Sequence, residues 1–242
     1  MIVLKLGGSV VTDKSSAETV AEERLARAAD AIAAHDGDLV LVHGGGSFGH
    51  PHAERHGVTT TDGTDDARAV VEIHGAMKEL NAAVVRTLLD RDVPAVPVHP
   101  LSAASRDDDG TLSLSIETPR RMLGEGFVPV LHGDVVAHAG RGATILSGDE
   151  LVVALARGLD ADRVGLCSDV PGVLDESGEV LTRVETFGDV ADALGGSGDT
   201  DVTGGMAAKV RELLELGAPA SVFDLDGLSS FLGGGAPGTR IG

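Results

Sequence analysis

Short apolar segments that end in glycine or a polar turn alternate along the chain with longer segments of helical periodicity. The apolar segments cover residues 2–6 (IVLKL), 38–42, 95–98, 127–133 and 161–168. The helical segments cover residues 17–34, 65–90, 148–159 and 203–217. Because short buried strands that alternate with helices form parallel sheets, the pattern predicts an α/β fold with a largely parallel central sheet.

Three shorter segments complete the predicted organisation. Residues 99–116 are rich in turn residues and alternate in polarity, which predicts a hairpin. The segment DVVAH, 134–138, is a candidate partner for the strand before it, and residues 226–232 predict a short helix. We find no linker, internal repeat or low-complexity tract, so the 242 residues are expected to form a single domain.

Composition narrows the class of protein. Apolar residues make up 42% of the chain, but no run of 18 uncharged apolar residues suggests a membrane span. The chain begins directly with MIVLKLGGS and shows no charged leader, so we expect a cytoplasmic protein. Cys167 is the single cysteine, which excludes an internal disulfide and a cysteine-rich metal site.

The charge balance is strongly acidic. The formal net charge is −19, from 38 acidic and 19 basic residues, which argues against nucleic acid or an anionic membrane as partner. The acidic residues are dispersed, and the chain has only four lysines, a pattern that a high-salt cytoplasm such as that of a halophilic archaeon would favour. Three of these lysines, Lys5, Lys14 and Lys209, lie beside glycine motifs.

The segment LVHGGGSFGHPHAERHG, residues 41–57, allows several interpretations. Its glycines fit a dinucleotide fingerprint, but no acidic residue ends a strand at the required distance, and Pro51 interrupts the opening helix. They also fit a nucleophile elbow, but the chain has no histidine after His138. A metal site of His50, His52 and His56 lacks a matched carboxylate set, so we predict no protein-held metal. A bare cradle for phosphate oxygens is the favoured interpretation.

Other glycine or polar loops follow the predicted strands. They are LGGS at 6–9, HGD at 132–134, SDVPG at 168–172 and DVTGG at 201–205. In open α/β sheets ligands bind at the carboxyl ends of strands, where consecutive glycines let backbone N–H groups approach phosphates. Lys5 would need an anion near it, and Asp149, Asp169 and Asp201 could orient lysines or Mg²⁺, although helix capping explains Asp149 nearly as well.

Six motifs in this order resemble the amino-acid kinase superfamily: KLGGSVVTDK, VHGGGSFGH, HGD, SGDE, SDVPGVL and DVTGGMAAKV. Within it, GGGSFGH followed by Pro51 is most similar to the archaeal isopentenyl phosphate kinases. The resemblance implies a three-layer αβα sandwich, a homodimer, and ATP with Mg²⁺ as cofactors. It further implies an acceptor-binding lobe of about residues 1–160 and a nucleotide-binding lobe of about 161–242.

The resemblance also assigns the site residues. Lys5, Lys14 and His50 would be catalytic. ATP would contact Lys5, Leu6, Gly7, Gly8, Ser9, Gly45, Gly46, Asp169, Val170, Gly205, Met206 and Lys209. The acceptor would contact Gly44, Gly45, Gly49, His50 and Gly148, with His50 on its phosphate.

The implied activity is phosphorylation of isopentenyl phosphate to isopentenyl diphosphate in isoprenoid biosynthesis (the alternate mevalonate pathway). A phosphate monoester is already a nucleophile at neutral pH, so the reaction needs positioning and charge neutralisation and no general base. Two alternatives stay open. One is a kinase of a carboxylate, carbamate or UMP acceptor on the same scaffold. The other is a non-catalytic nucleotide sensor.

Overall fold

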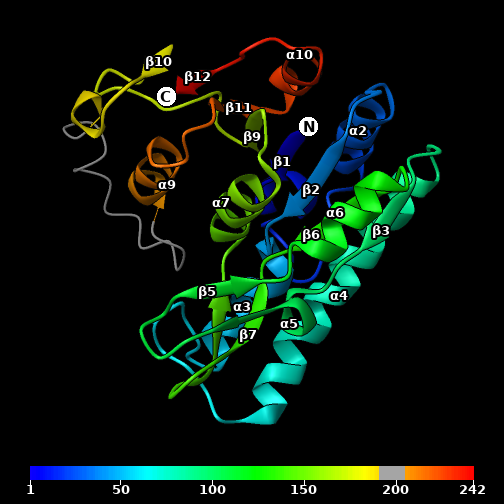
Figure 1. Cartoon of the computed structure of the whole chain (residues 1–242), viewed down its shortest axis with the longest axis vertical. Helices are drawn as coiled ribbons and strands as arrows, with labels where there is room; N and C mark the ends of the chain where they lie inside the picture. Colours follow the sequence, from blue (N-terminus) through cyan, green and yellow to red (C-terminus); the bar gives the residue numbers. More distant parts are fainter. Residues whose placement is uncertain (191–204) are drawn as a thin grey trace.

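An eight-stranded sheet runs through the molecule, with helices on both of its faces (Figure 1). The computed structural model describes residues 1–190 and 205–242, with the side chains of 205–209 excepted. In spatial order the strands are β10 (Arg183–Val184), β12 (Thr239–Ile241), β11 (Ala220–Asp224), β9 (Arg163–Ser168), β1 (Ile2–Leu6), β2 (Leu39–His43), β6 (Val128–His132) and β3 (Ala95–Pro97). Every neighbouring pair is parallel except β11 with β12, so the predicted largely parallel sheet is confirmed.

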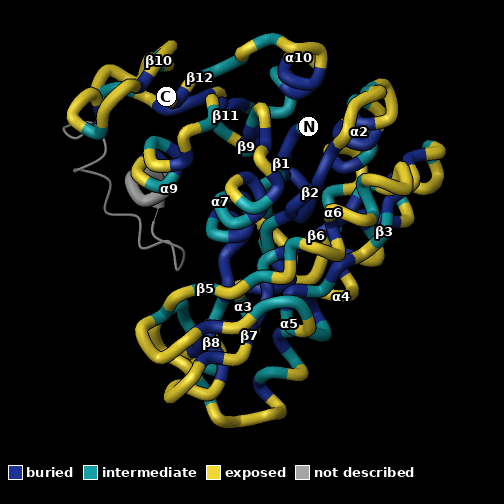
Figure 2. The backbone as a smooth tube through the Cα atoms, in the orientation of Figure 1, coloured by how far each residue is buried: buried dark blue, intermediate teal, exposed yellow. Residues whose placement is uncertain are grey.

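Six helices form the outer layers. On one face lie α2 (Glu22–Ala33), α4 (Ala67–Leu89) and α10 (Leu228–Leu232), packed against Leu4 and Leu41. On the other face lie α6 (Glu117–Gly124), α7 (Gly148–Leu159) and α9 (Gly205–Leu214), packed against Val3 and Val40. The central strands between them are the most completely buried part of the backbone (Figure 2). The three-layer αβα sandwich is therefore confirmed.

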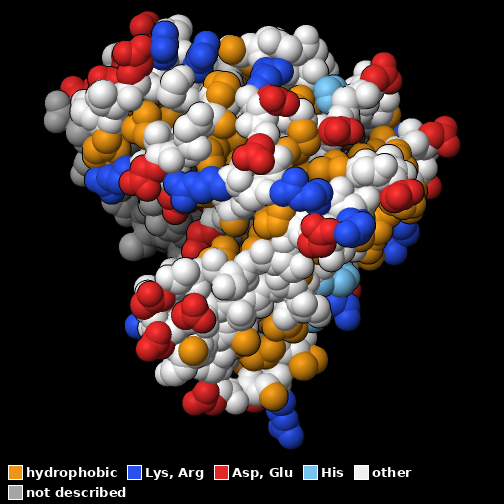
Figure 3. Space-filling model, in the orientation of Figure 1, with side chains coloured by type: hydrophobic (Ala, Val, Ile, Leu, Met, Phe, Trp, Pro, Cys, Tyr) orange, Lys and Arg blue, Asp and Glu red, His pale blue; other side chains and the backbone are white. Residues whose placement is uncertain are grey.

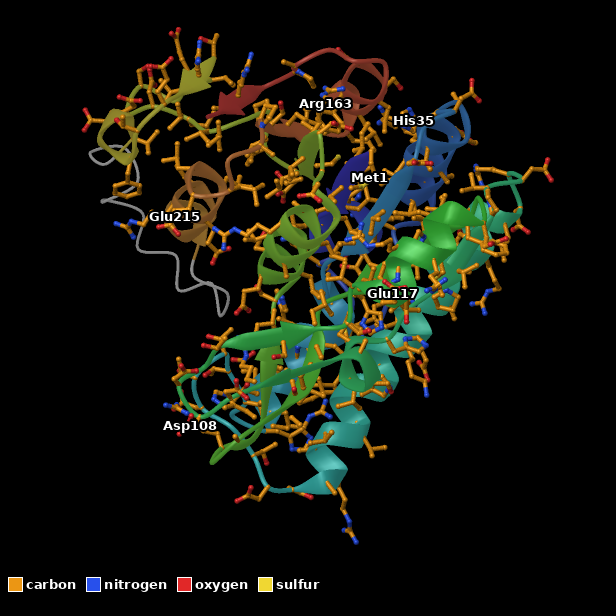
Figure 4. The ribbon with its side chains drawn as sticks, in the orientation of Figure 1. Met1, His35, Asp108, Glu117, Arg163 and Glu215 are labelled. Atoms are coloured by element: carbon orange, nitrogen blue, oxygen red, sulfur yellow. The ribbon has the colours of Figure 1, made fainter. Side chains whose placement is uncertain are left out.

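The register brings the carboxyl ends of four strands to one level. Leu6 of β1 is paired with His43 of β2 and with Cys167 of β9, and His43 is paired with His132 of β6. The glycine loops named above follow directly from these ends. Met1 and Arg163 lie at the opposite, amino end of the same strands (Figure 4).

A second sheet lies beyond the carboxyl ends. Its order is β5 (Leu112–Leu114), β4 (Ala104–Arg106), β7 (Asp134–His138) and β8 (Gly142–Leu146), with α5 (Pro100–Ala103) leading into β4. The antiparallel pair of β4 and β5 confirms a hairpin within 99–116. The prediction that 134–138 pairs with the strand before it is wrong, because β7 pairs with β8 and β4. Only Gly133 separates β6 from β7, which is too short for a hairpin loop, whereas three residues join β7 to β8.

Several helix boundaries differ from the predicted ones. The expected helix over 17–34 begins only at Glu22, because residues 12–20 close a loop through the Thr12–Val20 bridge and a 2.8 Å bond from Asp13 N to Thr19 O. The segment 226–232 divides into η2 (Leu225–Gly227) and α10. The remaining short elements are α1 (Gly8–Val11) and η1 (Phe187–Asp189). Within the described ranges no helix is both long and apolar enough to cross a membrane.

Helix α3 (Gly46–Arg55) continues through Pro51. The expectation that Pro51 interrupts this helix is therefore wrong. Proline lacks an N–H group, so it cannot bond the carbonyl of Ser47 four residues earlier. That carbonyl instead accepts a 3.1 Å hydrogen bond from the backbone N–H of Glu18. The lost helical bond is thereby replaced by a contact to the loop that precedes α2.

Candidate active site

A cavity of about 530 Å³ opens at the carboxyl ends of the central strands. Twelve of the site residues that the resemblance assigns line it, and so does Asp149. The twelve are Lys5, Gly7, Gly8, Ser9, Lys14, Gly44, Gly45, Gly46, Gly49, His50, Gly148 and Asp169. The two lysines and the histidine proposed as catalytic thus share one cavity, although Lys5, Lys14 and His50 come from different elements.

The other predicted residues are placed differently. Leu6 is fully buried in the core, and only its backbone reaches this region, where its carbonyl accepts a 3.0 Å bond from Gly44 N. Val170 follows the lining residue Asp169 but does not itself line the cavity. Asp201 lies outside the described residues. Gly205, Met206 and Lys209 belong to α9, but their side chains are not described.

The loops after β1 and β2 pack backbone against backbone. A Cβ on Gly8 would lie 2.6 Å from Gly46 N, and one on Gly44 would lie 2.7 Å from Gly8 N. Thr12 joins the loops as well, since its Oγ1 donates to Gly8 O at 2.8 Å and accepts from Ser47 N at 3.0 Å. Only glycine permits such an approach, so main chain and not side chains form this wall of the cavity. The N-terminus of α3 adds its partial positive charge there.

Strand alternation places Lys5 under α7. Leu4 and Leu6 face α2 and α4, so Lys5, like Val3, faces the opposite helices. Its Nζ donates to Asp149 Oδ1 at 2.6 Å, and both side chains are largely buried, with exposed fractions of 12% and 7%. Capping does not explain Asp149. Ser147 and Glu150 form the capping box of α7, with Glu150 N donating to Ser147 Oγ at 3.2 Å.

Lys14 supplies a second, more exposed cation. Its Nζ lies 3.0 Å from Asp169 Oδ2 in the loop after β9. Burial opposes ionisation of Asp169, but the hydrogen bond and charge of Lys14 outweigh it, so the pKa of this carboxyl is lowered. His50 lies in the middle of α3 and is exposed at the cavity wall.

Strands β2 and β6 each end in a histidine close to the cavity. His43 and His132 are fully buried, and burial lowers the pKa of both, which favours neutral rings at neutral pH. The sequence analysis noted the HGD loop but not its carboxylate. Asp134 lines the cavity and accepts a 2.9 Å bond from His74 Nδ1. The positive charge available to an anion here therefore comes from the lysines and not from His43 and His132.

Apolar side chains also line the cavity, and the sequence analysis named none of them as site residues. They are Pro51, Ala53, Ile73, Met77, Ile145 and Leu146. Met77 packs so closely that a Cβ on Gly49 would lie 2.7 Å from its Sδ. The four-residue spacing of Ile73 and Met77 in a helical segment was the available signal, because it places both on one helix face. The cavity is thus lined by both charged and apolar side chains.

The alternative metal site is not assembled. His52 and His56 each donate to Glu72 of α4 at 2.9 Å, whereas His50 lines the cavity. In the described parts of the chain no group of three or more histidine, cysteine or acidic side chains could hold a metal ion.

Glu212 of α9 is a titratable group close to the Lys5–Asp149 pair. Its Oε2 is buried and has no hydrogen-bond partner among the described residues. Burial, together with the charges of Asp149 and Glu150, raises the pKa of this carboxyl from 4.5 to about 7. Between the two pKa values the folded state keeps a proton that the unfolded state has lost. The free energy of unfolding is therefore highest, as far as Glu212 contributes to it, below pH 4.5, and this contribution is lost as the pH rises through about 7.

We therefore expect Glu212→Gln to stabilise the protein at pH 8. After discounting for partial exposure, the gain should be roughly 1 kcal/mol, or about 2–4 °C in Tm. Thermal unfolding at pH 8 and pH 5.5 measures it, and the gain should shrink at the lower pH. Glu215→Gln is the matched control and should give a much smaller gain, because Glu215 is an exposed carboxyl directly after the same helix and its charge is the smallest of the causes given for the raised pKa of Glu212 (Figure 4). An equal gain at both pH values would contradict the prediction.

Comparison with known proteins places the chain within a family. Residues 1–218 match the amino acid kinase family. The chain belongs to that family. Among its members, the chain is similar to isopentenyl phosphate kinases. The one from Haloferax volcanii is 64% identical over 243 residues, covering 100% of this chain and 98% of the relative. The one from Methanothermobacter thermautotrophicus is 38% identical and covers 89% of this chain and 86% of the relative. A solved structure of isopentenyl phosphate kinase has a TM-score of 0.85 at 31% identity, with 100% of both chains covered.

Proposed function

We propose that the protein transfers the γ-phosphoryl group of ATP to isopentenyl phosphate and produces isopentenyl diphosphate and ADP. The observation that carries this proposal is the mixed lining of one cavity. Lys5, Lys14 and His50 line it together with the apolar side chains of Ile73 and Met77. A phosphate monoester with a short branched alkyl chain matches both kinds of lining. The isopentenyl phosphate kinases that align with nearly the whole chain support the same substrate.

The residues of the chain would act by positioning and by charge neutralisation. The acceptor phosphate is largely a dianion at neutral pH, so its oxygen can attack the γ-phosphorus without losing a proton first. The main obstacle is repulsion between two polyanions. Lys5 and Lys14 would reduce it at the transferred group, the glycine loops would donate backbone N–H bonds, and His50 would hold a non-transferring acceptor oxygen.

We include Mg²⁺ in the proposal as the companion of ATP, where it would neutralise phosphate charge. Asp149 and Asp169 are carboxylates on the cavity wall, and each is held by a lysine. These two groups fit a site in which the chain supplies few ligands, because Mg²⁺ readily keeps water and phosphate oxygens in its shell.

The proposal also includes a high-salt cytoplasm as the location of the protein and a homodimer as its assembly. Acidic side chains are scattered over the visible face of the molecule without forming one patch (Figure 3). With a net charge of −19, this surface suits a high-salt cytoplasm, where screening weakens self-repulsion. The family resemblance adds a homodimer.

An ADP-release assay with a panel of acceptors tests the function directly. It compares isopentenyl phosphate with N-acetylglutamate, carbamate and UMP, at high salt and with Mg²⁺. We expect acceptor-dependent ADP release with isopentenyl phosphate alone. An acyl phosphate trapped by hydroxylamine would instead indicate a carboxylate kinase. ATP binding without release by any acceptor would indicate a sensor.

A further inference from the structure

We propose that His52, as an imidazolium bridging Glu18 and Glu72, is a positioning residue that holds the Lys14 loop across the cavity. The Lys14 loop is defined as residues 13–20, which connect α1 to α2. The inference rests on the proposed function, because it concerns how Lys14 is placed for phosphoryl transfer. It concerns a histidine that does not itself line the cavity.

The Lys14 loop forms one wall of the cavity. Lys14, Ser15, Ser16 and Ala17 line it at the tip of the loop. The base of the loop is closed by backbone bonds between its two ends, but its far side rests on α3. There Glu18 N donates to Ser47 O at 3.1 Å, the carbonyl that Pro51 leaves available. Glu18 adopts a φ of +48°, a left-handed conformation that non-glycine residues seldom adopt. Such a conformation persists only where surrounding contacts hold it.

The side chain of His52 provides such a contact. Its Nε2 lies 2.6 Å from Glu18 Oε1, and its Nδ1 lies 2.9 Å from Glu72 Oε1 on α4. The ring is only 12% exposed. A neutral imidazole carries a single N–H group, so it can donate to one carboxylate but not to both. The two short contacts therefore require the doubly protonated ring.

Two acidic and two basic side chains surround His52. Glu18 faces it from the loop and Glu72 from α4, while Arg55 lies on α3 with it and His56 directly follows that helix. Arg55 Nη1 also lies 3.3 Å from His52 Nδ1, a longer contact than the one to Glu72. Hydrogen bonds from His56 and His52 are the main causes that lower the pKa of Glu72 to about 2, so this carboxylate stays charged at any working pH.

The bridge ties the position of Lys14 to α4. A side chain that can donate to only one of the two carboxylates breaks the link from α4 through residue 52 to the loop. The far side of the loop would then be held only by its contacts with Ser47, which are the bond from Glu18 N to Ser47 O and the longer contacts between Thr19 and Ser47 Oγ. We expect Lys14 to sample positions away from the transferred phosphoryl group, which lowers kcat while the KM for ATP changes little.

Trypsin cleavage after Lys14 measures the loop without any substrate. The amount of fragment 1–14 is followed by mass spectrometry for the wild type, His52→Gln and His56→Gln. His56 is the matched control, because it is a histidine of the same helical segment that also binds Glu72 but has no contact with Glu18. We expect His52→Gln to raise the cleavage rate at Lys14 about tenfold, the effect of losing one hydrogen bond to a charged group. His56→Gln should leave it within about twofold.

Two further variants test the bridge itself. His52→Arg has several N–H donors on one planar group, so it should restore much of the loop protection that His52→Gln loses. Glu18→Ala removes the acceptor of the His52 Nε2 bond, so it should reproduce the His52→Gln result, and combining the two should add little. Equal cleavage at Lys14 in His52→Gln and His56→Gln would overturn the proposal. Because cleavage is read without acceptor, that failure is separate from inactivity toward isopentenyl phosphate.

Discussion

Replacing Lys5 with methionine should lower kcat by about 10²- to 10³-fold, the usual cost of removing one preorganised donor that faces charge developing in the transition state. Methionine keeps the length and apolar stem of lysine but has no charge. Since Lys5 is held by Asp149 at 2.6 Å beneath α7, its ammonium is fixed in place before any ligand arrives. Steady-state kinetics with isopentenyl phosphate and ATP measure the loss.

A control is needed because Lys5→Met also disturbs a buried ion pair. Removing one partner of such a pair can cost up to about 3–5 kcal/mol, so part of the lost activity could come from unfolding. The double variant Lys5→Met/Asp149→Asn removes both charges and should recover much of the stability in chemical denaturation. Its kcat should stay low. If the double variant also regains activity, Lys5 acts only through folding.

The parts of the fold that could be predicted are those fixed by local pattern. Runs such as IVLKL at 2–6 form strands because every residue must be buried, and the glycines after them mark the carboxyl ends where a ligand binds. The parallel sheet then brings these loops together without further information. Most glycines of the predicted site line the cavity for this reason.

What could not be predicted depends on pairs far apart in the chain. Lys5 and Asp149 are 144 residues apart, and a short strand does not specify which helix N-terminus will lie above it. The same holds for His52, which the sequence presented as a possible metal ligand and which the fold places between Glu18 and Glu72. Strand β8 was missed because it forms a hairpin with β7, whereas the sequence analysis had paired 134–138 with the strand before it.

His50→Ala should raise the KM for isopentenyl phosphate about 10- to 100-fold, the cost of losing one hydrogen bond to a charged group. His50 lies on α3 at the cavity wall, close in sequence to the glycines that would hold the acceptor phosphate. The KM for ATP should change little, because the proposed nucleotide contacts are Gly7, Gly8 and Ser9. Initial rates with each substrate varied in turn separate the two constants.

A second substitution distinguishes a hydrogen bond from simple space filling. His50→Gln retains an amide donor and should give an acceptor KM between those of the wild type and His50→Ala. Met77→Leu is a matched change among the apolar residues that line the same cavity, since it alters the shape of the cavity without removing a hydrogen-bond donor for phosphate. Its effect should depend on the alkyl chain of the acceptor, whereas the effect of His50→Ala should be similar for any alkyl monophosphate. Unchanged acceptor KM and turnover in His50→Ala would remove the main argument for a phosphate acceptor, because no other predicted catalytic residue lies on α3.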